Sequence, residues 1–322
     1  MQYMVKKDDK KTDAQKKDNN EDEKRNIAEK EAKKKKMVKK EKKADKRKTG
    51  KSKEEGVAGK GSKAEHKEVS ADIEITEEDI EKSGAHIGHI TSKLHPRMSD
   101  YILGIKSAVY IINSTQTKEG LIKALNYIIT LFKEGGSMLI VGTKPVFKEA
   151  VKQTAEKLGL PYVNERWLGG TFTNFSVILK RIEYFKKLKE SKEEGKFEQL
   201  SKKEKARKER EFEKLRKKFE GLVFMKKMPE AVFICDIVKD KTALMEARIK
   251  GISSVAIVDT NGDPSSVDFP IPANDDALTS VSYILGKVEE AVLAGRKERQ
   301  AFEADKEEAD DGSVDDGQEK KQ

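Results

Sequence analysis

Three of the four histidines, His86, His89 and His95, lie within ten residues of one another. Imidazole is a common zinc ligand, and a His-x-x-His spacing could place two rings on one side of a loop. No cysteine or nearby acidic residue completes a tetrahedral set around them. A structural zinc site therefore stays an alternative, and we expect the cluster to hold no metal.

A second group of candidate ligands is acidic. Asp259 and Asp263 occur in DTNGD, and Asp275 and Asp276 follow Asn274 in NDD. Carboxylate oxygens suit magnesium, but Asp and Asn at strand ends and helix starts more often form turns and caps. We expect turn formation here, with magnesium binding as the alternative.

Motifs for nucleotide or nucleophilic catalysis are missing from the sequence. VGTKP (141–145) follows an apolar run, but neither G-x-x-x-x-G-K-[ST] nor G-x-G-x-x-G follows such a run, and GKGSK (59–63) lies in a low-complexity tail. No G-x-S-x-G elbow occurs, and Cys235 lies in the apolar run AVFICDIV, typical of a buried core residue. We therefore expect no enzymatic activity and no cofactor. A nucleotide- or metal-dependent enzyme on a doubly wound sheet is the alternative.

Basic and hydroxyl side chains point instead to nucleic acid. HITSKLHPRM (89–98) combines Lys93, His95 and Arg97 with hydroxyl groups, which bind phosphate and ribose oxygens without reading a base sequence. Lys144 follows an apolar run and precedes a predicted helix, a location that favours anions. These four residues are candidate RNA contacts.

ERWLGGTFTNF (165–175) places the chain's one tryptophan beside an arginine and a Gly-Gly pair. Ordering two adjacent glycines costs backbone entropy, so such a pair usually serves a positive φ or a close backbone approach. We expect Trp167 to anchor the loop in the core, and Gly169 and Gly170 to let the backbone pass tightly. Arg166 and Asn174 are candidate RNA contacts, because a guanidinium fork suits phosphate and Asn174 lies near the start of the next helix.

The charge is unevenly distributed along the 322 residues, of which 39% are charged and 35% hydrophobic. Residues 1–70 contain 25 Lys and Arg against 15 Asp and Glu, whereas residues 301–322 contain 3 against 9. Low apolar content predicts a disordered Lys-rich extension over 1–70 and a disordered acidic tail over 301–322. The globular domain then spans 71–300. The extension attracts nucleic acid or only aids solubility, and the sequence leaves both open.

The cysteine content indicates the cellular compartment. A single cysteine excludes a disulfide framework within the chain and favours a reducing environment. No apolar run approaches a membrane span of roughly 20 residues, and the first residues lack a signal-peptide core. We expect a cytoplasmic protein without membrane contact.

Short apolar runs alternate with amphipathic helical patterns through the globular domain. SMLIVG, PYVNE, AVFICDIV and SSVAIVDT are predicted strands, and YILGIKSAVYIIN is a predicted β-hairpin with its turn near Lys106 and Ser107. Such alternation predicts a mainly parallel, doubly wound α/β sheet. Residues 177–227 interrupt it with a highly charged helical pattern. Within this segment, two apolar seams predict an inserted antiparallel helical hairpin packed as a coiled coil. One seam consists of Ile178, Ile182, Phe185 and Leu188, and the other of Phe212, Leu215, Phe219 and Leu222.

A series of motifs resembles the bacterial ribosomal protein S two family of the small subunit: GAHIGHITSKLHPRM, YILG, IVGTK, ERWLGGTFTNF and SSVAIVDTNGDPSSVDFPIPANDDA. The resemblance covers residues from about 76 to 296 in order and spacing. It implies a flavodoxin-like or Rossmann-like sheet without nucleotide chemistry, and the helical insertion after TNF that bacterial members carry. It also implies a structural role in translation, contacts with small-subunit ribosomal RNA and neighbouring ribosomal proteins, and a part in recruiting ribosomal protein one.

Overall fold

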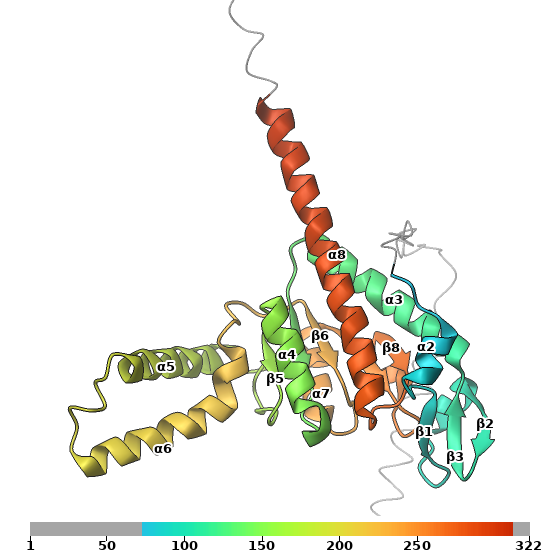
Figure 1. The fold of residues 1–322 in the computed structure, drawn as a ribbon, viewed down its shortest axis with the longest axis horizontal. Coiled ribbons are helices and arrows are strands. Elements are labelled where there is room, and N and C mark those ends of the chain that lie inside the picture. The colour runs from blue at the N-terminus through green and yellow to red at the C-terminus, as the bar shows by residue number, and fades with distance from the viewer. Residues whose placement is uncertain (1–72, 312–322) are drawn as a thin grey trace, which may run out of the picture. The chain divides into compact units, whose positions relative to one another are not determined.

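The structure is a computed structural model that describes residues 73–311. The predicted Lys-rich extension, residues 1–70, and the last eleven residues, 312–322, lie outside this range. Figure 1 shows the arrangement of the helices and strands.

Five parallel strands form the central sheet, in the order β5-β4-β6-β7-β8. The strands are β4 (Met138–Val141), β5 (Tyr162–Val163), β6 (Ala231–Ile234), β7 (Ser253–Val258) and β8 (Phe269–Pro272). Numbered from β4, this is the order 2-1-3-4-5 of flavodoxin-like sheets, whose topological switch point lies between the first and third strands. The predicted parallel α/β sheet is confirmed, and its switch point falls between β4 and β6.

Side chains on the two faces of the sheet enter separate cores, because successive residues of a strand point to opposite sides. In β4, Met138 and Ile140 join one cluster of buried residues, while Leu139 and Val141 join the other. Strands buried on both faces read as continuous apolar runs, which is why these runs stand out in the sequence.

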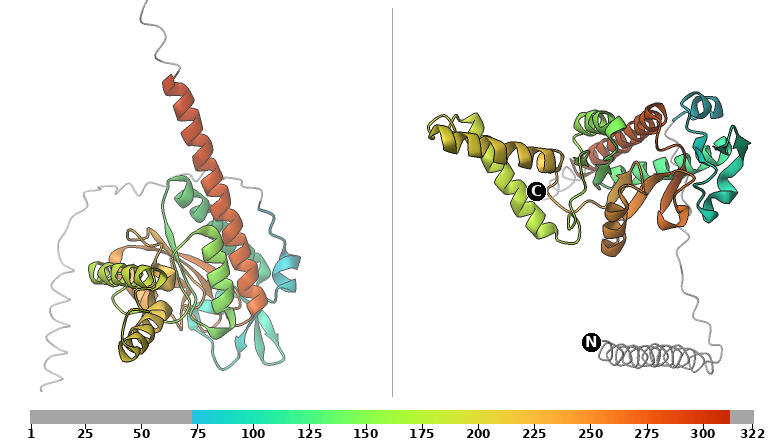
Figure 2. Two further views of the ribbon diagram at one scale, coloured as in Figure 1. Left: turned by 60° about the vertical axis from the view of Figure 1, so that its left-hand side comes forward. Right: turned by 90° about the horizontal axis from the view of Figure 1, so that it is seen from below.

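Helices cover both faces, as Figures 1 and 2 show. The first core is closed by α3 (Ser114–Lys133), α4 (Lys148–Leu158, after the 3-10 turn η2, Pro145–Phe147) and α8 (Leu278–Asp311). The second core contains α7 (Lys241–Lys250) and the short η3 (Glu220–Leu222). α8 continues to Asp311, so helix occupies part of the segment for which the sequence predicted a disordered acidic tail. None of the helices within residues 73–311 is long and apolar enough to cross a bilayer.

A second, three-stranded sheet has the order β1-β3-β2 and is antiparallel. Its strands are β1 (Ile87–Ile90), β2 (Ile102–Lys106) and β3 (Val109–Ile112). In the chain, α2 (Glu77–Lys82) precedes β1, and the 3-10 helix η1 (Pro96–Tyr101) connects β1 to β2. The β2–β3 hairpin was predicted with its turn near Lys106 and Ser107, and the turn residues in the structure are Ser107 and Ala108. β1 was not among the predicted strands, and it pairs with β3 although His89 interrupts its apolar character.

The turn between β2 and β3 is the basis of a stability prediction. Ser107 and Ala108 have φ values of 51° and 62°, as in the type I′ turn that favours Asn-Gly. L-residues other than Gly and Asn pay roughly 1 kcal/mol for such a conformation. We expect Ser107→Asn combined with Ala108→Gly to raise the free energy of unfolding by about 1 kcal/mol. Urea unfolding measures the change, and an unaltered or lower midpoint would show that the turn is not strained.

Two further helices lie between β5 and β6, in the segment where the helical hairpin was predicted. They are α5 (Phe175–Glu193) and α6 (Lys202–Phe219). The rings of Phe185 and Phe212 stack with centroids 5.6 Å apart, and Ile178, Ile182 and Phe219 are also buried. In Figure 1 the two helices extend away from the β5 side of the sheet, while the three-stranded sheet lies near β8.

Candidate nucleic-acid interface

The loop that carries Arg166 and the Gly-Gly pair folds around one buried carboxylate, that of Glu246 in α7. Oε1 accepts hydrogen bonds from Trp167 Nε1 (3.1 Å) and the Gly170 backbone N–H (2.8 Å). Oε2 accepts from the backbone N–H groups of Phe172 (3.0 Å) and Thr173 (3.1 Å), and from the Thr173 hydroxyl (3.1 Å). Five donors from one loop thus converge on a side chain that is 6% exposed.

These hydrogen bonds set the charge of Glu246. Burial alone would raise the pKa of the carboxyl group, but the donors from Thr173, Trp167, Gly170 and Phe172 outweigh it and hold the pKa below its ordinary value. The anion therefore organises the loop at neutral pH.

The other residues of this loop differ in their exposure to solvent. Trp167 is buried and contacts the ring of Phe172 edge to face, with centroids 5.0 Å apart. Gly170 has a φ of 93°, in the region that favours glycine, and its N–H donates to Glu246, whereas Gly169 is exposed and faces open space. Asn174 is the N-cap residue of α5 without a side-chain capping bond. Arg166 and Asn174 are both exposed, so their RNA contacts remain a proposal.

Lys144 lies at the switch point, and its ammonium group is enclosed by carboxylates. Nζ lies 2.6 Å from Asp236, 2.8 Å from Asp275 and 2.9 Å from Asp276. These residues follow β4, β6 and β8, whose carboxyl ends meet at one edge of the sheet. The ammonium group is thus already paired inside the protein, and we leave Lys144 out of the proposed RNA surface.

The carboxylate cluster also includes Asp259, after β7, which lies 3.0 Å from Nδ1 of His89. Burial, followed by the charges of Asp236 and Asp259, raises the pKa of Asp275 to about 7, although Lys144 opposes the shift. The hydrogen bond to Asp259 raises the pKa of His89 against the effect of burial. Asp275 and His89 therefore bind protons more tightly than an isolated carboxylate and imidazole do, whereas Lys144 holds the pKa of Asp276 below its ordinary value against the effect of burial.

His89, Asp275 and Asp276 each have a ligand atom within 4.8 Å of the others'. Oδ2 of Asp275 is buried without a hydrogen-bond partner, and this donor set suits a divalent cation. His86 and His95 do not join it. Among the described residues, the donors that could share an ion are thus one histidine, His89, and two members of the predicted acidic group, Asp275 and Asp276.

The loop from 89 to 98 packs against the turn after β7. The His95 backbone N–H donates to the Thr260 carbonyl (2.8 Å), and His95 Nδ1 accepts from the Arg97 N–H (3.3 Å). Arg97 forms an exposed ion pair with Asp263 at 2.9 Å. Lys93 is exposed and forms no ion pair within residues 73–311, although its charge helps to lower the pKa of Asp276. Of Lys93, His95 and Arg97, Lys93 is therefore the most available for a contact outside the chain.

A basic groove at the base of α6 was missed in the sequence. It has a volume of about 340 Å³ and lies between the start of α4, the residues after β5 and the end of α6. Five basic side chains line it: Lys148, Lys152, Arg216, Lys217 and Lys218. Asn164 and Glu165 also line the groove, and Arg166 follows them directly in the chain.

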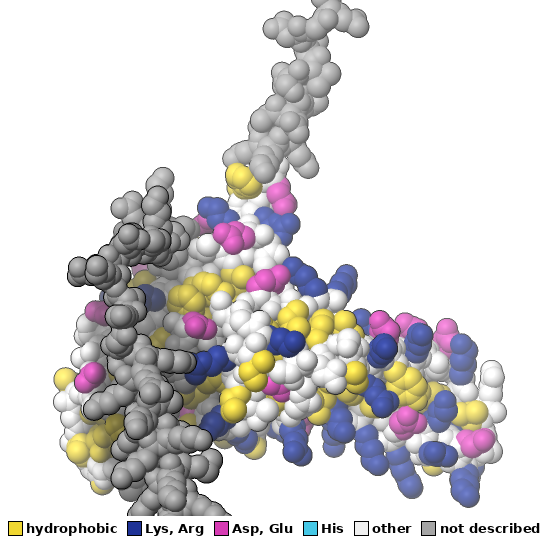
Figure 3. Space-filling view, turned by 180° about the vertical axis from the view of Figure 1, so that it is seen from behind, with side chains coloured by type: hydrophobic (Ala, Val, Ile, Leu, Met, Phe, Trp, Pro, Cys, Tyr) yellow, Lys and Arg dark blue, Asp and Glu magenta, His cyan; other side chains and the backbone are white. Residues whose placement is uncertain are grey.

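Positive charge continues from this groove along α5 and α6. α6 contains 10 Lys and Arg against 4 Glu, and most of these basic side chains are exposed. Figure 3 shows Lys and Arg side chains gathered along the part of the surface formed by α5 and α6. Groove and helices together form a basic surface, which we define by Arg166, Lys148, Arg216, Lys217 and Lys218.

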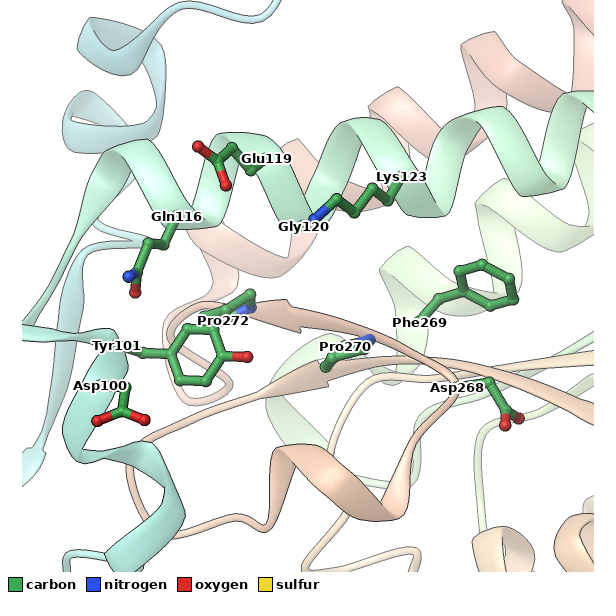
Figure 4. Close-up of a pocket in the computed structure, with 10 residues that line it drawn as sticks. All are labelled: Asp100, Tyr101, Gln116, Glu119, Gly120, Lys123, Asp268, Phe269, Pro270 and Pro272. Carbon is green, nitrogen blue, oxygen red and sulfur yellow. The ribbon is translucent and has the colours of Figure 1, made fainter. Parts of the chain in front are cut away.

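A groove of different character lies between η1, α3 and β8 (Figure 4). Its volume is about 480 Å³, and Tyr101, Phe269, Pro270 and Pro272 form its apolar part. Three carboxylates, from Asp100, Glu119 and Asp268, line it against the single amine of Lys123. This excess of negative charge disfavours phosphate groups, so RNA is expected at the basic surface instead.

The matches with known proteins agree with the motifs. A family model described as Ribosomal protein S2 matches residues 81–295, which contain both sheets and the helices α5 and α6. A protein described as small ribosomal subunit protein uS2, from Coprothermobacter proteolyticus, is 39% identical over 228 residues. That match covers 71% of this chain and 85% of the relative. With the flavodoxin-like strand order and the RWLGG loop in place, the chain belongs to the ribosomal protein S2 family, whose members have a structural role in the small ribosomal subunit.

Proposed function

We propose that this chain binds small-subunit ribosomal RNA through the basic surface and acts as a structural, non-enzymatic component of the subunit in the cytoplasm. The observation that carries the proposal is the convergence of five basic side chains on one groove at the base of the hairpin. Lys and Arg that neutralise RNA phosphates release counterions, which favours binding without base-specific contacts.

The Glu246 loop supports the same proposal by positioning Arg166. A guanidinium group on a flexible loop would lose both side-chain and backbone entropy on binding. The backbone of a loop fixed by five hydrogen bonds is already ordered, so binding costs less backbone entropy. Lys93 and Asn174, both exposed, are further proposed contacts.

The hairpin and the partners complete the proposal. We infer that α5 and α6 pack as a short coiled coil, because the stacked Phe185 and Phe212 lie on the two predicted seams. Family membership favours contacts with neighbouring small-subunit proteins and help in recruiting ribosomal protein one.

The test replaces Arg166, Lys217 and Lys218 by glutamine in the full chain and measures binding to small-subunit ribosomal RNA. Each lost phosphate contact lowers the slope of log affinity against log salt by up to about 0.9. We expect the slope to fall by about 2 to 3 and the affinity at low salt by more than tenfold.

A matched control removes the same charge from another face, through Lys106→Gln, Lys118→Gln and Lys123→Gln. All three lie on β2 or α3, and the last lines the acidic groove. Equal losses in both triple variants would show that only net charge matters, and the basic surface would not be the binding site.

A further inference from the structure

A pocket of about 390 Å³ lies at the amino ends of the strands of the central sheet, whereas the carboxylate cluster lies at their carboxyl ends. Its walls are the end of α3 with Gly135 and Gly136, the residues that follow α4, and Phe224. The remaining wall is α8, which passes the carboxyl end of α3 (Figure 1) and contributes Arg296 and Arg299.

Arg296 is the unusual residue of this pocket, because its guanidinium group is partly buried and forms no ion pair within residues 73–311, although Glu303 also lines the pocket. The guanidinium group of Arg296 lies over the ring of Phe132, whose centroid is 5.5 Å from Cζ. No ion pair of Arg296 is recorded among residues 73–311, and burial lowers the pKa of the guanidinium group. A cation that is partly desolvated and unpaired gains when an anion enters beside it.

Arg299 provides a second guanidinium group one helical turn away, on the same side of α8. Its Nε pairs with Glu303 at 2.7 Å, an exposed i,i+4 contact of the kind that contributes little. The Arg299 guanidinium lies over Gly135, where any Cβ would displace it. Because Gly135 has no side chain, the guanidinium group of Arg299 can lie against its backbone.

Phe224 adds an aromatic ring to the lining of the pocket and is 49% exposed. Lys226, two residues further along, is also exposed. Two guanidinium groups beside an exposed ring are what single-stranded RNA needs, because its phosphates pair with the cations and its unstacked bases stack on the ring. An acidic peptide would use the cations but leave the ring without a comparable partner.

We propose that this pocket binds one nucleotide of single-stranded RNA, with its phosphate between Arg296 and Arg299 and its base on Phe224. The inference rests on the proposed RNA binding of the chain and adds a second contact site, distinct from the basic surface at the hairpin.

The test uses the full-length protein and a single-stranded RNA tetranucleotide that carries 4-thiouridine, cross-linked by light and mapped by mass spectrometry. We expect a cross-link at Phe224, and Arg296→Gln should reduce its yield at least tenfold. Lys297→Gln removes the same charge from an exposed neighbouring position and should change the yield less than twofold.

Thermal unfolding separates binding from a structural role. Arg296→Gln removes no ion pair within residues 73–311 and loses only the contact with the Phe132 ring, so it should change the melting temperature by less than about 4 °C. A fall of more than about 4 °C would assign Arg296 to the fold and overturn the proposal.

The remaining outcomes are also decisive. Cross-links on α5 or α6 without one at Phe224 would overturn the pocket alone, and equal losses in both glutamine variants would do the same. Displacement of the RNA by a tetraglutamate peptide at equal concentration would show that the pocket takes acidic peptides instead. No RNA binding by any part of the chain would remove the proposed function as well.

Discussion

Replacing Glu246 by alanine is expected to lower the free energy of unfolding by about 3 to 5 kcal/mol, because several buried donors lose their acceptor together. The substitution leaves four N–H groups without their hydrogen-bond acceptor: the indole N–H of Trp167 and the backbone N–H groups of Gly170, Phe172 and Thr173. Water cannot replace the carboxylate without opening the loop. Urea unfolding at pH 7 measures the loss, and RNA affinity should fall with it because Arg166 is no longer held in place.

A matched control is Glu183→Ala, since Glu183 is an exposed glutamate on α5. Surface substitutions of this kind change stability by no more than about 0.5 kcal/mol. Similar losses in the two variants would mean that the Glu246 hydrogen bonds do not hold the loop. Glu246→Gln should fall between them, because its amide group presents N–H donors to a loop that offers only donors.

Replacing Lys144 by methionine should cost about 3 to 5 kcal/mol, as expected when one member of a buried charge network is removed. Methionine keeps the length of the side chain but leaves Asp236, Asp275 and Asp276 without their shared cation. The matched control is Lys148→Met, whose ammonium group pairs with Glu165 alone at 2.6 Å near the surface. That pair contributes no more than about 1 kcal/mol.

The free energy of unfolding of the Lys144 variant should also depend on pH differently from that of wild type. Asp275 has a folded-state pKa of about 7, above the unfolded value of about 3.9, so the native state binds its proton more tightly. Its contribution to stability is therefore present below pH 4 and is lost as the pH rises through 7. Without Lys144 the pKa of Asp275 rises further, so the variant should lose more stability than wild type between pH 5 and pH 8. Parallel pH profiles would contradict this account of the cluster.

The sequence predicted the strands that carry clear patterns and missed those that do not. β4, β6 and β7 are continuous apolar runs, as strands buried on both faces must be. β8 was missed because Pro270 and Pro272 argue against a strand, yet prolines are tolerated here since β8 lies at the edge of the sheet. β1 was missed because its four residues include Gly88 and His89.

The site depends on contacts between distant residues, which local patterns do not reveal. Glu246 lies 79 residues from Trp167 in the chain, and the one available signal was a charged residue beside Ala243 and Ala247 on the apolar face of α7. Lys144 lies where an anion was predicted, but the anions are the protein's own carboxylates, brought there by β6 and β8. The basic groove joins α4 and α6, which are more than 40 residues apart.

Sedimentation of the tagged full-length chain through a sucrose gradient at about 0.15 M ionic strength tests the central claim most directly. The account predicts that the chain migrates with the small subunit, and that the Arg166, Lys217 and Lys218 glutamine variant shifts toward the top of the gradient as salt is raised. A wild-type chain that stays at the top while other small-subunit proteins sediment would contradict a structural role in the subunit.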